Sequence, residues 1–161
     1  MAALQLKMAT KEDVATILYF IRQLAIYEKM IDQVIASEES LRKWLFEEKK
    51  AEVVLGEIEG KVIGFALFFH NFSTFLGKAG LYLEDLYIEP SYRHQGYGRM
   101  FFTYLANLAL QRHCGRFEWA CLDWNQPSID FYKGLGAIPL NEWTIYRLDE
   151  AKMKALVGCK D

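Results

Sequence analysis

The chain has 161 residues, of which 52% are hydrophobic and 15% aromatic, and its formal net charge at pH 7 is −2. This composition excludes a disordered chain and fits one globular domain, residues 1–161, with a sizeable core. The near-balance of acidic and basic residues offers no broad surface for phosphates, and no apolar stretch is long enough to cross a bilayer. We therefore expect neither a nucleic acid nor a membrane as partner.

The spacing of the cysteines and histidines bears on whether the protein contains disulfides or a metal site. The three cysteines have no close spacing, which predicts neither a disulfide framework nor a metal knuckle, and the three histidines lack partners at metal-ligand spacing. Residues 1–7 lack the basic and then apolar layout of a secretory signal. We expect a cytoplasmic protein without a bound metal.

The first half of the chain shows strand and helix patterns in turn. Leu4, Leu6 and Met8 alternate with polar neighbours, as in a short strand. Thr10 and Asp13 have capping-box spacing, and apolar residues then recur at helical intervals. The remaining expected elements are a helix from Ser37, strands over 53–58 and 62–69 joined by a Glu59-Gly60 turn, a loop over 71–80, and a strand over 81–88.

The second half continues the mixture. We expect helices over 100–112, 127–135 and 149–157 and strands over 117–122 and 143–148, with Gly136 capping the middle helix. The early hairpin run implies antiparallel pairing, and the later strand–helix–strand units imply parallel crossovers. The pattern predicts an α/β domain of three layers, in which helices cover both faces of a mixed central sheet.

A glycine-containing loop joins one predicted strand to the following helix. Its sequence is Arg93-His94-Gln95-Gly96-Tyr97-Gly98. A helix N-terminus presents unpaired N–H groups with partial positive charge, and glycine lets a phosphate approach the backbone closely. The loop lacks the lysine of a P-loop and the first glycine of a dinucleotide fingerprint. On these six residues alone, a phosphate-binding loop and a turn that merely begins a helix are both open.

The loop matches the Arg/Gln-x-x-Gly-x-Gly/Ala pattern that holds pyrophosphate in the GNAT superfamily of N-acetyltransferases. Residues 24–28, 82–85, 123–128 and 131–133 resemble the spermidine/spermine acetyltransferase branch of that superfamily. Residues 122–126 are similar to a sister branch that favours thialysine, a lysine analogue. The resemblance extends from about Leu4 to Leu148, and the segment 137–143 is a few residues shorter than the branch pattern.

The resemblance implies a GNAT-like fold, acetyl-CoA as acetyl donor, direct attack by a small amine in a ternary complex, and a homodimer. It implies that the cofactor contacts main-chain groups of Leu86, Tyr87 and Ile88, the loop residues Arg93, His94, Gln95, Gly96, Tyr97, Gly98 and Arg99, and the later residues Asn125, Gln126, Pro127 and Ser128. It implies that the amine contacts Tyr27, Glu28, Glu84 and Asp85.

Acetylation of an amine requires removal of a proton from an ammonium group. An alkylammonium pKa of about 10.4 puts the neutral amine roughly 4.6 kcal/mol uphill at pH 7. A carboxylate must therefore bind the cation and accept its proton. The resemblance gives this task to Glu84, whose alternative is a solvent-facing acid. Strand alternation predicts opposite faces for Glu84 and Asp85, so we do not expect the two acids to form an acid/base dyad. We expect Asp85 to be structural rather than catalytic.

Tyr132 is the expected acid for the leaving thiolate. A phenol with a pKa near 10 can donate to a thiolate of reference pKa about 8.5. The alternative is simple packing in a short aromatic helix, and the position of Tyr132 in the Asn-x-x-Ser-x-x-Phe-Tyr pattern of the resembling branch favours the acid. Asn125 suits a helix N-cap as well as a cofactor contact. Glu28 closes a helix whose dipole it opposes, which favours some role other than simple solvation, and the resemblance implies that this role is contact with the amine.

We therefore expect an acetyl-CoA-dependent N-acetyltransferase that acts on a polyamine, a diamine or a lysine analogue such as thialysine. Two alternatives stay open at this point. The acceptor is a peptide or protein amine in the first, and the chain is a non-catalytic acyl-CoA-binding module in the second.

Overall fold

The computed structural model describes residues 2–158. The chain forms two compact units, Met1–Ala120 and Cys121–Asp161. No helix of the described residues has the length and hydropathy needed to traverse a lipid bilayer.

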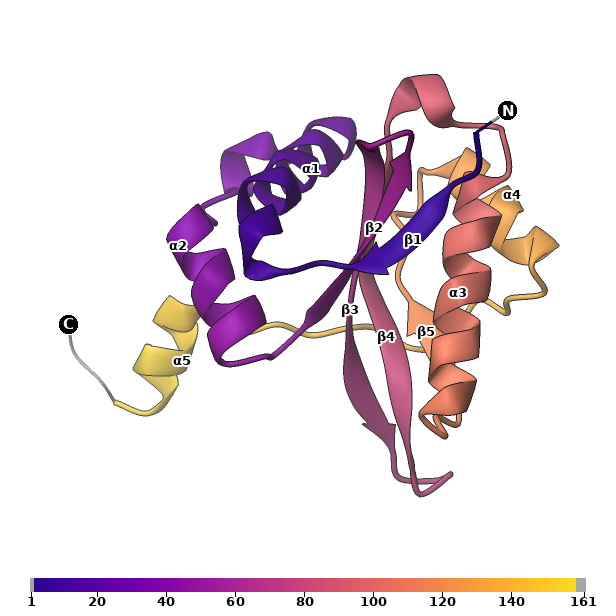
Figure 1. Ribbon diagram of the computed structural model, residues 1–161. Coiled ribbons are helices and arrows are strands. Elements are labelled where there is room, and N and C mark those ends of the chain that lie inside the picture. Colours follow the sequence, from indigo (N-terminus) through magenta and orange to yellow (C-terminus); the bar gives the residue numbers. More distant parts are fainter. Residues whose placement is uncertain (1, 159–161) are drawn as a thin grey trace. The chain divides into compact units, whose positions relative to one another are not determined.

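The first unit is built on a mixed five-stranded sheet in the order β1-β2-β3-β4-β5 (Figure 1). The strands are β1 (Gln5–Met8), β2 (Glu52–Ile58), β3 (Lys61–Ser73), β4 (Lys78–Ile88) and β5 (Phe117–Trp119). The first four pair antiparallel, and β5 pairs parallel to β4. The predicted mixed sheet is therefore confirmed.

Two long helices cover opposite faces of this sheet. They are α1 (Val14–Tyr27) and α3 (Tyr97–Gln111). Ile17 and Phe20 of α1 share a buried cluster with Leu55 and Phe65, and the Phe20 and Phe65 rings stack at 5.7 Å. A Cβ atom on Gly56, the next residue of β2, would lie 2.7 Å from the Phe101 ring of α3. This close approach explains why glycine occupies the α3 face at that point, and it confirms the three-layer α/β fold.

Shorter elements complete both units. In the first unit they are the 3₁₀ turns η1 (Lys11–Asp13), η2 (Ile31–Gln33) and η4 (Pro90–Tyr92), the helix α2 (Glu38–Leu41) and the π-helical segment η3 (Arg42–Glu47). The second unit carries α4 (Gln126–Gly134) and α5 (Glu150–Leu156).

Local capping explains where several elements begin. The Thr10 N–H donates to the Asp13 carboxylate at 2.8 Å, and the Ser40 N–H donates to the Ser37 hydroxyl at 3.1 Å. Glu59 and Gly60 both have positive φ, at 49° and 81°, which is the requirement of the tight turn between β2 and β3. These signals were local, and the structure confirms the elements predicted from them.

Three of the predicted elements differ from the structure. The expected loop over 71–80 is mostly strand, because β3 runs to Ser73 and β4 begins at Lys78. The strand expected over 117–122 ends at Trp119. No strand forms over 143–148, because no described residue pairs with that segment. In each case the outcome depends on a partner strand, which local propensity does not reveal.

Candidate functional site

A β-bulge interrupts β4 at Glu84. Leu67 of β3 lies opposite Asp85, whereas the next residue, Phe68, lies opposite Leu83. Glu84 is therefore the extra residue of β4, and its side chain is exposed. Bulges of this kind bend a strand and redirect side chains near functional sites.

The bulge reverses the alternation of side chains along β4. Before it, Leu83 pairs with Phe68, whose ring lies 5.8 Å from the Arg112 guanidinium at the end of α3. After it, Asp85 pairs with Leu67, which packs on the cluster that α1 covers. The expectation that Glu84 and Asp85 face opposite ways assumed an unbroken strand, and the bulge removes that basis.

Asp85 and Glu28 lie close enough to other acids for their pKa values to rise. Burial, then the charges of Glu84 and Glu28, raise the pKa of Asp85 from 3.8 to about 7. Burial, then the charge of Glu84, raises the pKa of Glu28, which caps the end of α1. Such a cluster of acids favours a cation, because a bound positive charge relieves both burial and repulsion.

Arg93 connects the end of β4 to the end of α1. Its Nε donates to the Ile88 carbonyl at 2.8 Å, and its guanidinium lies 5.2 Å from the Tyr27 ring and 5.1 Å from the Tyr87 ring. The side chain therefore holds two tyrosines of the predicted site. Because the Arg93 side chain makes these contacts, the contact that we expected between Arg93 and the cofactor would come from its main chain.

The loop after Arg93 presents backbone groups to solvent. His94 and Gly96 both have left-handed backbones, with φ of 62° and 86°. Gly96 is the N-cap of α3, and the N–H groups of Tyr97, Gly98 and Arg99 lie in the first turn, where a helix leaves its donors without internal acceptors. His94, Gln95 and Gly96 are exposed. This arrangement fits a diphosphate, which accepts N–H hydrogen bonds and is attracted by the helix dipole.

β4 and β5 separate beyond the bulge. In the part of the chain that the structure describes, β5 pairs only with residues 81–83 of β4. On the other side of β4, Leu86, Tyr87 and Ile88 stay paired with β3. The β5-facing edge of these three residues is therefore available for the main-chain contacts that we expected there.

The second unit carries the remaining predicted residues. The Asn125 side chain accepts from the Ser128 N–H at 3.3 Å, so Asn125 is an N-cap of α4, whose first helical residues are Gln126 and Pro127. Tyr132 lies in the last part of α4, and its ring is 5.7 Å from that of Phe131. The N-cap alternative is thus confirmed for Asn125, and it leaves a cofactor contact possible.

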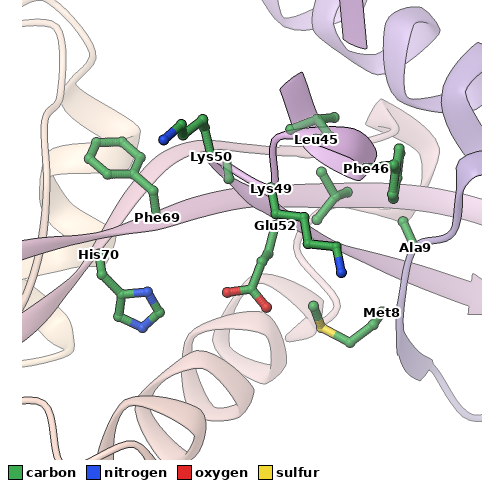
Figure 2. A pocket seen from close by; sticks show the side chains of 11 residues that line it. Met8, Ala9, Leu45, Phe46, Lys49, Lys50, Glu52, Phe69 and His70 are labelled. Atoms are coloured by element: carbon green, nitrogen blue, oxygen red, sulfur yellow. The ribbon is translucent and has the colours of Figure 1, made fainter. Parts of the chain in front are cut away.

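A separate cavity of about 270 Å³ lies in the first unit, away from the predicted site residues (Figure 2). It is lined by Met8, Ala9, Leu45, Phe46, Lys49, Lys50, Ala51, Glu52, Val53, Phe69 and His70. Its one carboxylate, Glu52, is held by Arg112 through hydrogen bonds of 2.6 and 2.9 Å. Among residues 2–158, no cluster of His, Cys, Asp or Glu has the arrangement of a metal site.

Sequence reasoning missed two features of the site. The bulge at Glu84 depends on the register with β3, and Asp85 gains its unusual surroundings from that bulge. The placement of Arg93 between Tyr27 and Tyr87 depends on residues distant in the chain. The only sequence signal for the first feature was two adjacent acids on a predicted strand that is otherwise apolar.

Comparisons with known proteins identify relatives of this chain. The acetyltransferase (GNAT) family profile matches residues 18–137. Thialysine N-epsilon-acetyltransferase of Sus scrofa is 39% identical over 98% of this chain and 99% of that protein. L-ornithine N5-acetyltransferase NATA1 of Arabidopsis thaliana is 28% identical over 94% of this chain and 87% of that protein.

A solved structure also matches closely. An integron cassette protein of V. cholerae superposes with a TM-score of 0.80 at 26% identity, covering 98% of each chain. The profile extends across both compact units, and the pig relative matches over nearly full length. This chain therefore belongs to the GNAT family of acetyltransferases.

Proposed function

We propose that this N-acetyltransferase transfers the acetyl group of acetyl-CoA to the side-chain amine of a short amino acid of the lysine-analogue class, such as thialysine. The observation that carries the proposal is the acidic surroundings of Asp85 and Glu28, which raise the pKa of both carboxyl groups. The names of the pig and Arabidopsis relatives support the same acceptor class.

The clustering of the three acids favours a single ammonium group over an extended polycation. Burial and neighbouring acidic charge raise the pKa of Asp85 and of Glu28, so one bound cation relieves both groups. A polyamine carries further cations that need separate acids. A thioether near the amine, as in thialysine, withdraws electron density and makes the neutral amine easier to form.

Asp85 and Glu84 divide the handling of the proton. Glu84 is exposed on the bulge and meets the incoming ammonium, as we expected for the substrate-binding carboxylate. Asp85 is the better acceptor of the proton, because the rise in its pKa from 3.8 to about 7 makes that transfer about 4 kcal/mol less uphill. Glu84 thus keeps its predicted place at the amine, and Asp85 gains a role beyond the structural one.

The remaining roles follow the sequence expectations. Acetyl-CoA, when bound, supplies a thioester that the neutral amine attacks, so that an N–C bond forms and the C–S bond breaks. The first turn of α3 binds the diphosphate, and main-chain N–H groups near Leu86, Tyr87 and Ile88 support the acetyl carbonyl. The Tyr132 hydroxyl donates its proton to the departing thiolate.

We further place the enzyme in the cytoplasm as a homodimer. Cys114 is a free thiol, which suits a reducing compartment. The small net charge of −2 supports a small-molecule acceptor over a nucleic acid.

A panel of amines tests the acceptor. CoA release is measured with acetyl-CoA and thialysine, lysine, ornithine, putrescine or spermidine, and the acceptors are ranked by kcat/KM. We expect thialysine to exceed spermidine at least tenfold. The highest kcat/KM for spermidine would overturn the acceptor class, and no CoA release with any amine would overturn the enzyme assignment.

A pair of variants tests the site itself. Glu84→Gln should raise KM for the amine at least tenfold, because it removes the exposed charge that meets the cation. Glu59→Gln removes an equally exposed carboxylate at the β2–β3 turn and should leave KM unchanged. Equal kinetics for the two variants would remove Glu84 from the site.

A further inference from the structure

A second group of polar side chains lies on the sheet where β5 runs beside β4 (Figure 1). Tyr82 of β4 is paired with Glu118 of β5, so the two side chains point to the same face. The ring of Phe117, the residue before Glu118, lies 5.6 Å from the Phe102 ring of α3. Glu118 therefore points to the opposite face of the sheet, the one on which α1 packs.

The side chains around Glu118 form a mixed-charge cluster. Arg116 Nε lies 3.0 Å from Glu118 Oε1, and Asn71 Nδ2 donates to the same oxygen at 3.3 Å. Arg116 Nη2 donates to the Phe72 carbonyl at 3.1 Å. Among residues 2–158, Arg116 Nη1 and Glu118 Oε2 have no protein partner. A cationic donor and an anionic acceptor therefore lie side by side, both available to a ligand.

Tyr82 connects this cluster to the acidic residues that we expect to bind the amine. Its ring lies 5.2 Å from that of Phe69, its partner on β3. Burial, then the charges of Glu84 and Glu118, raise the pKa of Tyr82, so this side chain lies within range of both carboxylates. Two aromatic rings thus occupy the sheet surface between the bulge and the mixed-charge cluster.

The spacing of the two charged regions matches a short amino acid. Along β3, the partners of Asp85 and Tyr82 are two residues apart, which is about 7 Å. In a lysine-like amino acid, the α-carbon and the side-chain nitrogen are separated by five bonds, or about 6 Å when extended. An amine held at Asp85 therefore allows the head group to reach the level of Tyr82 and its neighbour Glu118.

We propose that Arg116 and Glu118 bind the zwitterionic head group of the acceptor amino acid, with its α-carboxylate at Arg116 and its α-ammonium at Glu118. This inference rests on the function proposed above and names the residues that select an amino acid over a diamine. A diamine brings a second cation but no carboxylate, so Arg116 repels it and offsets its attraction to Glu118. The rings of Phe69 and Tyr82 suit a thioether, because divalent sulfur packs favourably against aromatic rings.

Two analogues of thialysine separate the two contacts. Bis(2-aminoethyl) sulfide lacks the α-carboxylate, and 3-(2-aminoethylthio)propanoate lacks the α-ammonium. Calorimetry with CoA present, so that no acetyl transfer occurs, gives the Kd of each ligand. The wild type should bind thialysine at least tenfold more tightly than either analogue.

Variants at the two positions should each lose one contact. Arg116→Gln should raise the Kd of thialysine at least tenfold and change that of bis(2-aminoethyl) sulfide less than threefold, because this analogue has no carboxylate for the guanidinium. Glu118→Gln should likewise weaken thialysine and change 3-(2-aminoethylthio)propanoate less than threefold. Arg42→Gln removes an exposed guanidinium on η3 and should leave all three Kd values unchanged.

Equal losses for thialysine and the insensitive analogue would mean that the variants act only through the fold, and would overturn the inference. A wild type that binds the three ligands equally, or binds none, would overturn it as well. CoA release from acetyl-CoA is measured separately. Selective loss of thialysine binding without acetylation of any amine would refute only the proposed function, whereas acetylation of thialysine with equal binding of both analogues would refute only this inference.

Discussion

The acidic cluster makes a specific prediction about stability and pH through Asp85. The Asp85→Asn variant keeps the shape of the side chain but removes its charge. Burial and the charges of Glu84 and Glu28 raise the pKa of Asp85 to about 7 in the folded protein, against 3.8 ordinarily. Between these two values the folded chain holds a proton that the unfolded chain releases. The free energy of unfolding must therefore fall as pH rises through this range.

The size of this fall follows from the same values. Each pH unit between 3.8 and about 7 removes about 1.4 kcal/mol of stability, and above pH 7 the contribution is flat. From pH 5 to pH 8 the wild type should lose about 3 kcal/mol through this group. The Asn variant lacks the titration, so its loss should be smaller by that amount. For a chain of this size, the difference corresponds to roughly 6–12 °C in Tm.

Thermal unfolding at pH 5, 6, 7 and 8 in one ionic strength checks the prediction. The matched control is Asp123→Asn, which removes an exposed carboxylate outside the cluster and should follow the wild-type pH dependence. If the Asp85→Asn curve parallels the wild type within 1 °C, the carboxyl is not held in its neutral form near pH 6. The argument for Asp85 as proton acceptor would then fail.

Three further predictions concern the loop, the tyrosine and the arginine. Gly96→Ala puts a side chain at φ +86°, where strain costs about 1–2 kcal/mol, and should weaken CoA binding in calorimetry at least fivefold; Gly60→Ala carries similar strain at φ +81° and should leave CoA affinity unchanged. Tyr132→Phe should lower kcat at least tenfold with CoA affinity unchanged, whereas equal losses in both would assign Tyr132 to binding. Arg93→Ala should lower the free energy of unfolding by about 2 kcal/mol in urea titrations, because the Ile88 carbonyl loses a charged donor at 2.8 Å. An unchanged free energy of unfolding would show that this hydrogen bond does not stabilise the fold.

Helices and turns were predictable because their signals lie within a few residues. Asp13 bonds the Thr10 N–H, Ser37 caps α2, and Gly136 has a φ of 91° just after α4. Each of these depends on a side chain or backbone preference that the sequence states directly. The helix bounds therefore agree with the expectation to within three residues at each end.

The sequence named candidate residues for the site but could not give their geometry. Glu84 and Asp85 drew notice as adjacent acids, yet their orientation depends on how β4 aligns with β3. That alignment places Leu67 opposite Asp85 and Phe68 opposite Leu83, which leaves Glu84 as the extra residue. A register shift of one residue changes which face each later side chain occupies. No property of β4 alone determines this shift.

Strand prediction fails for the same reason over residues 143–148. A helix bonds its backbone within itself, so the signals for α5 are local, and the Asp149 side chain caps it by accepting from the Lys152 N–H at 2.9 Å. A strand needs a neighbour for every backbone group that it buries. The pattern of residues 143–148 describes a strand covered on both faces, while the chain forms none there. The pattern therefore describes side chains that suit a strand, and whether a strand forms depends on a neighbour that the pattern does not name.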